Sequence, residues 1–333
     1  MAATQPKSSG FQGPPALGGS RAEPWRGPGR SPDILVLLAT YNGSAFLEAQ
    51  LASLDAQDYP RWRLLARDDG STDATPQILR AWAARHPGRI ALLEDSAGRQ
   101  GVVGNFSRLL AAGDATWFMF CDQDDFWLPD KLSAFAGRMA ALESRLGRDT
   151  PILIHSDLAV VDRDLASLAP SFWRRQRLDV RRGGRFRALL RRNVVTGCAC
   201  MGNAALRRLA VPVPAEALMH DWWLALVAAA AGHVEVLDRA TVLYRQHEAN
   251  EIGSRPVGWP ALPGAWLRHP HWELVAIPRR LRRRQMQAVA LQQRLATRMP
   301  PERYAECAGF IAARRARDIV ERIRDWVKVL KQE

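Results

Sequence analysis

The sequence predicts an α/β fold, with a mostly parallel, Rossmann-like sheet that is flanked by helices. Short apolar runs typical of buried strands alternate with segments of helical periodicity at least four times before residue 150. Polar and acidic residues follow several of these runs at the point where each strand would end. The chain has 333 residues, 47% of them hydrophobic. It can therefore bury the core of one large domain with extra elements, or of two domains.

The alternation starts with DILVLLAT, residues 33–40, a buried strand that ends at the turn sequence YNG. The next elements are expected in this order: helix 44–57, strand 62–67, helix 74–86, strand 89–94, helix 101–112, strand 115–121, helix 129–146 and strand 152–161. Pro129 suits the first turn of its helix. Later elements should be a basic helix in FRALLRRN, a helix near 203–209, a helix entered through His220 and Asp221, and two short strands at 233–238 and 241–246.

Composition divides the chain into four parts. Residues 1–31 are rich in Gly, Pro and Ser and lack an apolar core, so we expect a disordered leader and no signal peptide. Residues 32–252 should form the α/β domain. Residues 253–271, rich in Pro, Gly and Trp, are expected to be a linker, and residues 272–333 a basic helical C-terminal extension.

Two features favour a cytoplasmic protein. The four cysteines fit neither a zinc pattern nor a disulfide framework, which suits a reducing compartment. No apolar stretch approaches the 18 residues that a membrane span needs. Peripheral contact with the inner face of the cell membrane stays open as an alternative.

The charge balance points to an anionic partner. Lysine and arginine outnumber the acidic residues 47 to 34, which gives a net charge of +13. Such a partner is a nucleic acid, an anionic membrane surface or a phosphorylated ligand. RRLRRR at 279–284 is either a solvated helix face or a membrane-contacting one. We expect no nucleic-acid partner, since no nucleic-acid motif is present, but a non-catalytic basic nucleic-acid-binding protein remains an alternative.

Acidic residues gather after neighbouring strands of the predicted sheet. Asp68 and Asp69 follow the second strand, and Asp122, Asp124 and Asp125 follow the fourth. Because ligands of such sheets bind at the carboxyl ends of the strands, these carboxylates should share one crevice. They could meet an anionic nucleotide diphosphate only through a divalent cation, and Mn²⁺ or Mg²⁺ takes such oxygen ligands. The alternative is a solvated acidic turn before the next helix.

Four motifs, in this order and spacing, resemble the inverting family 2 glycosyltransferases: ATYNG (39–43), RDDGSTDAT (67–75), CDQDDFW (121–127) and HDWW (220–223). The resemblance covers about residues 33–250. The segment LYRQHEAN (243–250) is similar to bacterial members of the rhamnosyltransferase-like branch. The resemblance implies a GT-A fold and a nucleotide-sugar donor. The QxxRW-like motif of processive members is missing from the sequence, so transfer of a single sugar is expected.

The resemblance also implies roles for individual residues. Asp68 would bind the nucleobase, whereas Asp69 is interpreted as a turn residue. Asp124 would be the main metal ligand, with Asp122 on the metal or the ribose and His247 as a late metal or diphosphate contact. Further nucleotide-sugar contacts would come from Thr40, Tyr41, Asn42, Arg99, Asn105 and Gly197.

Asp221 is the candidate catalytic base, because inverting transfer needs one carboxylate to take the proton of the acceptor hydroxyl. Its alternative role is that of a helix N-cap. The expected partners are a dTDP- or UDP-sugar and a glycan or lipid-linked acceptor, in cell-surface polysaccharide, O-antigen or glycolipid assembly. The oligomeric state is left open. A Mg²⁺-dependent nucleotidyltransferase is the second alternative, although the Gly-rich basic loop of that class is missing near the first strand.

Overall fold

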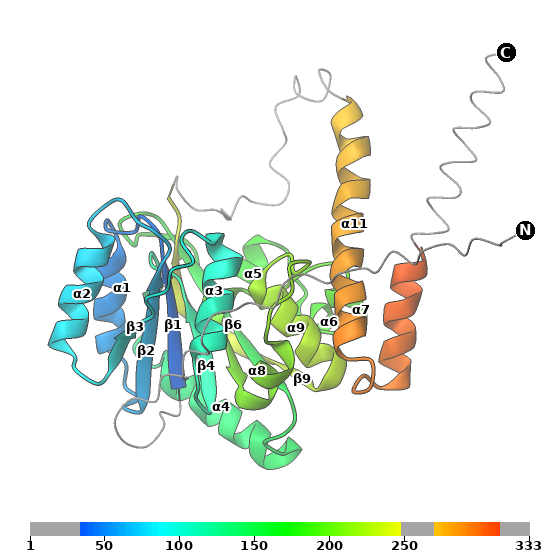
Figure 1. Ribbon diagram of the computed structural model, residues 1–333, viewed down its shortest axis with the longest axis horizontal. Coiled ribbons are helices and arrows are strands. Elements are labelled where there is room, and N and C mark those ends of the chain that lie inside the picture. The colour runs from blue at the N-terminus through cyan, green and yellow to red at the C-terminus, as the bar shows by residue number, and fades with distance from the viewer. Residues whose placement is uncertain (1–33, 248–269, 314–333) are drawn as a thin grey trace, which may run out of the picture.

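The chain folds around one mixed sheet with helices on both faces (Figure 1). The computed structural model describes residues 34–247 and 270–313. The predicted leader lies outside the described residues, as does the linker up to residue 269. The strands run in the spatial order β3-β2-β1-β4-β8-β6-β9-β5, and β7 pairs with β6. Their bounds are β1 Ile34–Thr40, β2 Trp62–Asp68, β3 Ile90–Leu92, β4 Trp117–Cys121, β5 Phe126–Trp127, β6 Ile152–Val161, β7 Ser167–Ala169, β8 Cys200–Asn203 and β9 His233–Arg245.

The longer helices of the described residues lie close to the ranges that periodicity predicts. Their bounds are α1 Leu47–Asp55, α2 Thr75–Arg85, α3 Gly101–Ala112, α4 Lys131–Leu146, α5 Phe172–Arg175, α6 Val180–Gly183, α7 Phe186–Leu189, α8 Ala204–Ala210, α9 His220–Ala231 and α11 Pro270–Arg294, with a 3-10 turn at Gly197–Ala199. FRALLRRN therefore forms only one helical turn, α7. The short helices α5 and α6 are not predicted from the sequence.

The N-terminal half of the sheet is parallel, as predicted. β1 pairs in parallel with β2 on one side and with β4 on the other. In this register Thr40 lies opposite Asp68, and Leu38 lies opposite Cys121. The residues that follow these strands are therefore brought to the same edge of the sheet.

Beyond β4 the strand directions are mixed. β8 is antiparallel to both β4 and β6, whereas β6 and β9 are parallel. The two short strands expected at 233–238 and 241–246 are one strand, β9. The register of β9 against β6 shifts near Asp157, and these irregularities let the strand continue through the predicted break.

Alternation along β1 sends side chains into two cores. Leu35 and Leu37 pack on the face covered by α3 and α9. Ile34, Val36 and Leu38 pack on the opposite face, where α1, α2 and α4 supply the buried partners. The sheet is thus buried on both sides, as a Rossmann-like arrangement requires.

The C-terminal helices pack beside α9. α11 stands next to α9 and rises past the edge of the domain (Figure 1). Its buried Leu291 and Leu295 join the core, and Gln287 accepts a hydrogen bond from the backbone N–H of Leu218 at 2.7 Å. A second helix follows over 301–313. Among the described residues, none of the helices combines the length and the apolar character of a membrane span.

Candidate active site

A cavity of about 540 Å³ opens at the carboxyl ends of β1 and β4 and beside the start of α9. Polar side chains from both halves of the sheet meet there. The predicted site residues that line it are Thr40, Tyr41, Arg99, Asn105, Asp122, Asp124, Gly197 and Asp221. Asn42, Asp68 and His247 are not among the lining residues. The sheet therefore brings most of the predicted set into one cavity.

The carboxylates after β4 form a repulsive cluster. Asp122 and Asp124 line the cavity, and Asp125 is fully buried behind them. Ligand atoms of Asp122, Asp125 and Cys198 all lie within 4.8 Å of one another. Burial, and then the neighbouring charge of Asp124, raises the pKa of Asp125 to about 7. The pKa of Asp122 is raised for the same reasons, burial first and the nearby carboxylates second.

One buried cation lies beneath this cluster. Lys131, at the start of α4, is fully buried, and its Nζ donates to the carbonyl of Cys198. The same Nζ lies 3.4 Å from the centre of the Trp127 ring. Burial lowers the pKa of Lys131 to about 8, against the attraction of Asp125 and the cysteine groups. Lys131 thus neutralises part of the negative charge of the aspartate cluster from the core side. The side of the cluster that faces the cavity is left for a positively charged ligand.

The donor set fits a hard divalent cation. Asp122, Asp124 and Asp125 offer carboxylate oxygens, and the buried Asp125 Oδ2 has no hydrogen-bond partner among the described residues. Burial raises the pKa of the Cys198 thiol well above its usual value, so that group stays protonated and is a poor ligand. Oxygen ligands of this kind suit Mg²⁺ or Mn²⁺.

His247 reaches this cluster from the end of β9. Its Nε2 lies 2.9 Å from Asp124 Oδ2, and its ring stacks on Phe46 at 4.6 Å between centroids. Arg245 donates from Nε to the carbonyl of Asp124 at 2.8 Å. The structure therefore brings His247 to the predicted metal ligand, although His247 itself does not line the cavity.

Asp221 lies in the first turn of α9 and is 6% exposed. Met219 occupies the N-cap position, so the alternative role of Asp221 as the N-cap is wrong. Its Oδ1 accepts from Asn193 Nδ2 at 3.1 Å and from the backbone N–H of Trp222. Burial raises the pKa of Asp221 to about 7 despite these hydrogen bonds. A carboxylate with this pKa can take up a proton at neutral pH.

Gly197 lets the loop before β8 approach the start of α9. A Cβ at this position would lie 2.9 Å from His220 Nε2. His220 is buried between Phe106 and Phe120, at ring distances of 4.3 and 4.6 Å. Burial lowers the pKa of His220 to about 3, so its ring is neutral. Any larger side chain at 197 would therefore require this packed histidine to shift, and its Cβ would also contact Asp221, whose Cβ would lie 3.7 Å away.

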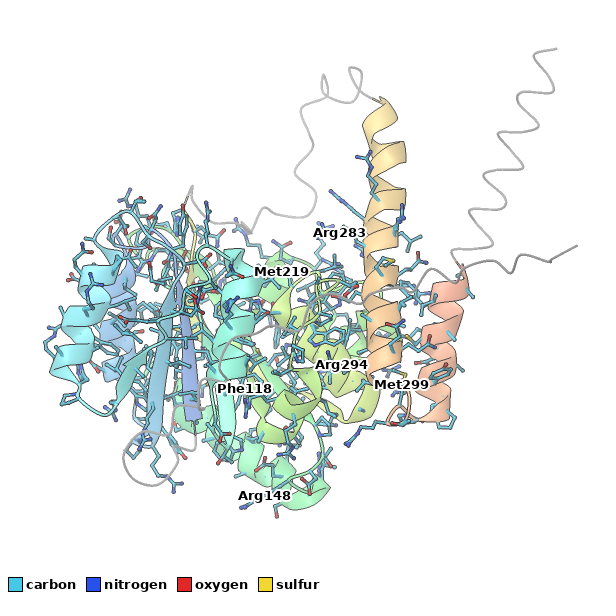
Figure 2. All side chains as sticks on the ribbon, viewed as in Figure 1. Phe118, Arg148, Met219, Arg283, Arg294 and Met299 are labelled. Carbon is cyan, nitrogen blue, oxygen red and sulfur yellow. The ribbon has the colours of Figure 1, made fainter. Side chains whose placement is uncertain are left out.

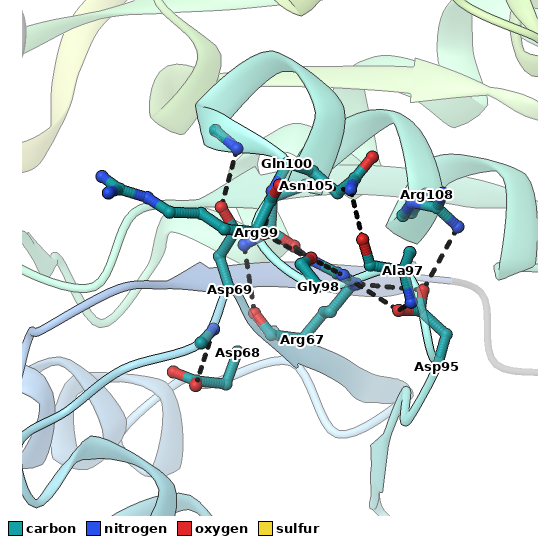
Figure 3. Close-up of polar contacts among 12 residues, drawn as sticks. Arg67, Asp68, Asp69, Asp95, Ala97, Gly98, Arg99, Gln100, Asn105 and Arg108 are labelled. Atoms are coloured by element: carbon teal, nitrogen blue, oxygen red, sulfur yellow. Dashed lines mark hydrogen bonds and ion pairs between the residues drawn. The ribbon is translucent and has the colours of Figure 1, made fainter.

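The polar contacts of Asp68 and Asp69 differ from the interpretation of Asp69 as the turn residue (Figure 3). Asp68 accepts from Thr40 Oγ1 at 2.9 Å and from the backbone N–H of Ser71 at 2.8 Å, which makes it the residue that closes the turn. Asn42 belongs to the same turn, where its Oδ1 accepts from the N–H of Thr72 at 2.8 Å. Asp69 is buried and lines the cavity.

Asp69 fixes the loop that carries Arg99. It accepts from the backbone N–H groups of Gln100 and Gly101, both at 2.7 Å, and pairs with Arg67 at 2.8 Å. The Arg99 guanidinium lies 4.0 Å from the centre of the Tyr41 ring. The sequence signal that could have identified Asp69 is the preceding Arg67, because a buried arginine requires a nearby carboxylate.

Removing the Asp69 carboxylate should destabilise the fold more than removing that of Asp68. Asp69→Ala leaves Arg67 with one partner fewer in a buried position, and we expect a loss of about 3 kcal/mol of unfolding free energy. Asp68→Ala loses partly exposed turn hydrogen bonds, for which about 1 kcal/mol is expected. Urea denaturation of the two variants measures the difference. Equal losses would contradict the structural role assigned to Asp69.

Two further residues of the site were missed by the sequence interpretation. Gln123 bonds to both backbone groups of Tyr41, accepting from its N–H at 2.8 Å and donating to its carbonyl at 2.9 Å. Asn193 orients Asp221 and also lines the cavity. Gln123 could have been found as the central residue of DQD, whereas Asn193 lies in an arginine-rich segment without any motif.

Residues 35–146 match the family model described as "Glycosyl transferase family 2". The chain carries a family 2 glycosyltransferase domain. Over 222 residues it is 30% identical to an uncharacterized protein of Mycobacterium bovis, which covers 64% of this chain and 58% of that protein. Over 228 residues it is 25% identical to a dTDP-rhamnosyl transferase of Shigella flexneri, covering 65% of this chain and 74% of the relative. The domain thus has a rhamnosyltransferase-like relative along most of its length.

Solved structures of low identity share the fold. TarS of S. aureus, solved with UDP-GlcNAc, superposes with a TM-score of 0.54 at 17% identity, covering 84% of this chain and 71% of the TarS chain. A mannosyltransferase of Pyrobaculum calidifontis, solved with GDP-Man and Mn²⁺, gives 0.50 at 19% identity, covering 89% and 79%. The expected GT-A fold is therefore confirmed.

Proposed function

We propose that the protein is a metal-dependent, inverting glycosyltransferase that moves one sugar from a nucleotide diphosphate sugar to an acceptor hydroxyl. The observation that supports this most directly is that carboxylates from two separate elements line one cavity. Asp122 and Asp124 face it from the end of β4, and Asp221 faces it from α9. Two separate carboxylate sites are what transfer by direct displacement needs: one for the leaving diphosphate and one for the incoming hydroxyl.

In this proposal Asp221 accepts the proton of the acceptor hydroxyl as its oxygen attacks the anomeric carbon. Asn193 holds the carboxylate in place through a hydrogen bond. The close contact between Gly197 and His220 fixes the start of α9. No covalent intermediate is required, so the anomeric configuration inverts. Asp122, Asp124 and the adjacent His247 would hold Mn²⁺ or Mg²⁺. Such a cation stabilises the negative charge that develops on the leaving diphosphate.

The donor is proposed to be a dTDP- or UDP-sugar. The similarity to a dTDP-rhamnosyl transferase favours a deoxyhexose donor. Thr40, Tyr41, Arg99 and Asn105 line the half of the cavity nearest β1 and would contact the nucleotide. The ring of Tyr41, covered by Arg99, offers a flat surface to a base. One relative, a glucosyltransferase of Escherichia coli, is named for a diphosphoundecaprenol acceptor, which supports a lipid-linked acceptor.

A thermal-shift screen tests the donor site. UDP, dTDP and GDP sugars are added with and without Mn²⁺ or Mg²⁺. A ligand at a hundred times its Kd stabilises the native state by about 2.7 kcal/mol, so the matching nucleotide should raise the Tm by several degrees, and only with the metal. No shift with any nucleotide would contradict the proposed donor site. Product analysis then decides the class: release of free nucleoside diphosphate from the matching nucleotide sugar indicates sugar transfer, whereas release of pyrophosphate from a nucleoside triphosphate and a sugar phosphate indicates a nucleotidyltransferase.

A further inference from the structure

Residues 174–192, which run beside the mouth of the cavity, are unusually basic. This segment holds nine arginines and a single acidic residue, Asp179. Its exposed arginines are Arg174, Arg177, Arg181, Arg182, Arg185, Arg187, Arg191 and Arg192. Among the described residues, only two of them have a carboxylate within ion-pair distance: Arg181 with Asp238 at 2.9 Å and Arg182 with Asp179 at 3.6 Å. The charge of this segment is therefore mostly not neutralised by the part of the chain that the structure describes.

A second set of arginines stands on α11 where this helix rises past the domain. Arg279, Arg280, Arg282 and Arg283 are exposed there, and Arg284 is half-buried. Residues 279–299 contain no acidic residue. Arg280 and Arg284 continue the stripe that is buried lower on the helix at Ala288, so they face the domain side of α11.

Packing brings the two sets to the same side of the molecule. Both α7 and α11 pack on α9. The Arg284 guanidinium lies 5.9 Å from the centre of the Trp222 ring, and Trp222 donates from Nε1 to the carbonyl of Leu189 in α7. Trp222 and Arg192 both line the cavity. The exposed arginines of 174–192 and of 279–283, here called the arginine face, thus belong to two segments that both contact Trp222 in the cavity wall.

We propose that the arginine face docks the protein on the surface of a bilayer that contains anionic lipids. The face extends over two separate elements and carries far more charge than one diphosphate could neutralise. Apolar side chains lie near the arginines: Phe172 and Leu178, which are half-buried in the cavity lining, and Met286, 43% exposed, on α11. A mixture of basic and apolar groups is typical of membrane-surface contacts, where the arginines bind headgroup phosphates.

The proposed docking would turn the cavity mouth toward the membrane. A lipid-linked acceptor could then present its hydroxyl to Asp221 without leaving the bilayer. This use of the face rests on the proposed function, whereas the docking itself does not. Vesicle binding and nucleotide binding can therefore be measured separately, and one can fail while the other holds.

The test uses co-sedimentation of the full chain with vesicles. One vesicle type contains phosphatidylglycerol and phosphatidylcholine, the other phosphatidylcholine alone. We expect binding to the first type only, and loss of that binding at high salt because the interaction is screened. The test variant replaces Arg174, Arg187, Arg280 and Arg283 by Gln. Since each arginine near an anionic bilayer changes binding about fivefold, the variant should bind roughly a hundredfold more weakly or worse.

A matched control variant removes the same charge elsewhere. It replaces Arg80, Arg85, Arg145 and Arg148, which are exposed on α2, on α4 and just after α4. Figure 2 shows Arg148 at the lower edge of the domain, well away from Arg283 on α11. The control should keep vesicle binding, and both variants should keep the Tm shift with nucleotide and metal. Equal loss in the two variants, or no binding to anionic vesicles by the unmodified chain, would overturn the proposal. So would tighter binding of single-stranded RNA than of vesicles through the same four arginines.

Discussion

Asp221→Asn should reduce sugar transfer by roughly 10²–10⁴-fold, the range that positioned proton transfer contributes. The amide keeps the Oδ1 acceptor toward Asn193 and Trp222, so the start of α9 should keep its geometry. What the variant loses is the ability to take up a proton. The measurement is kcat with saturating donor and acceptor. Transfer at the normal rate would show that Asp221 is not the base.

The pH dependence of kcat/KM should also identify Asp221 as the base. The base works only when it is deprotonated, and the pKa of Asp221 in the free protein is about 7 because the group is buried. We therefore expect kcat/KM to rise with pH up to about 7 and to level off above it. In Asp221→Asn the residual activity should lack this rise. An identical rise in the variant would assign the titration to another group.

As pH rises, the folding stability of the protein should fall while its activity increases. The folded pKa of Asp221 lies about three units above the ordinary value of 3.8. Ionising this buried group therefore costs the native state stability as pH rises from about 4 to about 7, by roughly 4 kcal/mol in total. The neutral amide avoids that cost. Asp221→Asn should consequently melt at a higher temperature than the unmodified protein at pH 8 and at a similar temperature near pH 4. A lower Tm at pH 8 would indicate that the variant has lost packing.

The strand ends of the parallel half could be predicted because the pattern is local. DILVLLAT and the run before Asp122 are short apolar segments, and parallel pairing carries the residues after them to one edge. In the mixed half, the sequence predicts β6 and the two parts of β9 as strands, but neither β8 nor the antiparallel pairings. β8 has four residues, and its pairing with β4 and β6 depends on contacts that are distant in the sequence.

The placement of Asp68 in a turn and of Asp69 at the cavity shows the limit of motif reasoning at the site. Two adjacent aspartates look alike in a sequence, and the side chains of a strand end alternate in direction. Which of them faces the cavity depends on where Arg67 and the loop at 98–101 pack. The same holds for Lys131. Its charge suggests an exposed helix start, but the buried carboxylate and the carbonyl of Cys198 make an interior position favourable.

Asp124→Asn should abolish the metal-dependent part of donor binding. The amide has nearly the same size and keeps one oxygen, but it lacks the charge that attracts a hard cation. Because a bound metal contributes several kcal/mol to stabilising a leaving diphosphate, transfer should fall roughly a hundredfold or more. The metal-dependent rise of Tm with nucleotide should disappear as well. Removing metal from the unmodified protein with EDTA should reproduce both losses, and added Mn²⁺ should reverse them.

The variant also separates a metal site from a merely acidic turn. Asp124 borders Asp122 and Asp125, whose mutual repulsion is part of what raises their pKa values. Removing one charge should therefore relieve the repulsion, so Asp124→Asn without nucleotide should be as stable as the unmodified protein or more so. The amide also keeps an oxygen that can accept a hydrogen bond from His247. Asp149→Asn, at a fully exposed carboxylate paired with Arg208, serves as the control and should change neither transfer nor metal response. A solvated acidic turn would make the two variants behave alike, whereas a cation site requires that only Asp124→Asn lose activity while keeping its fold.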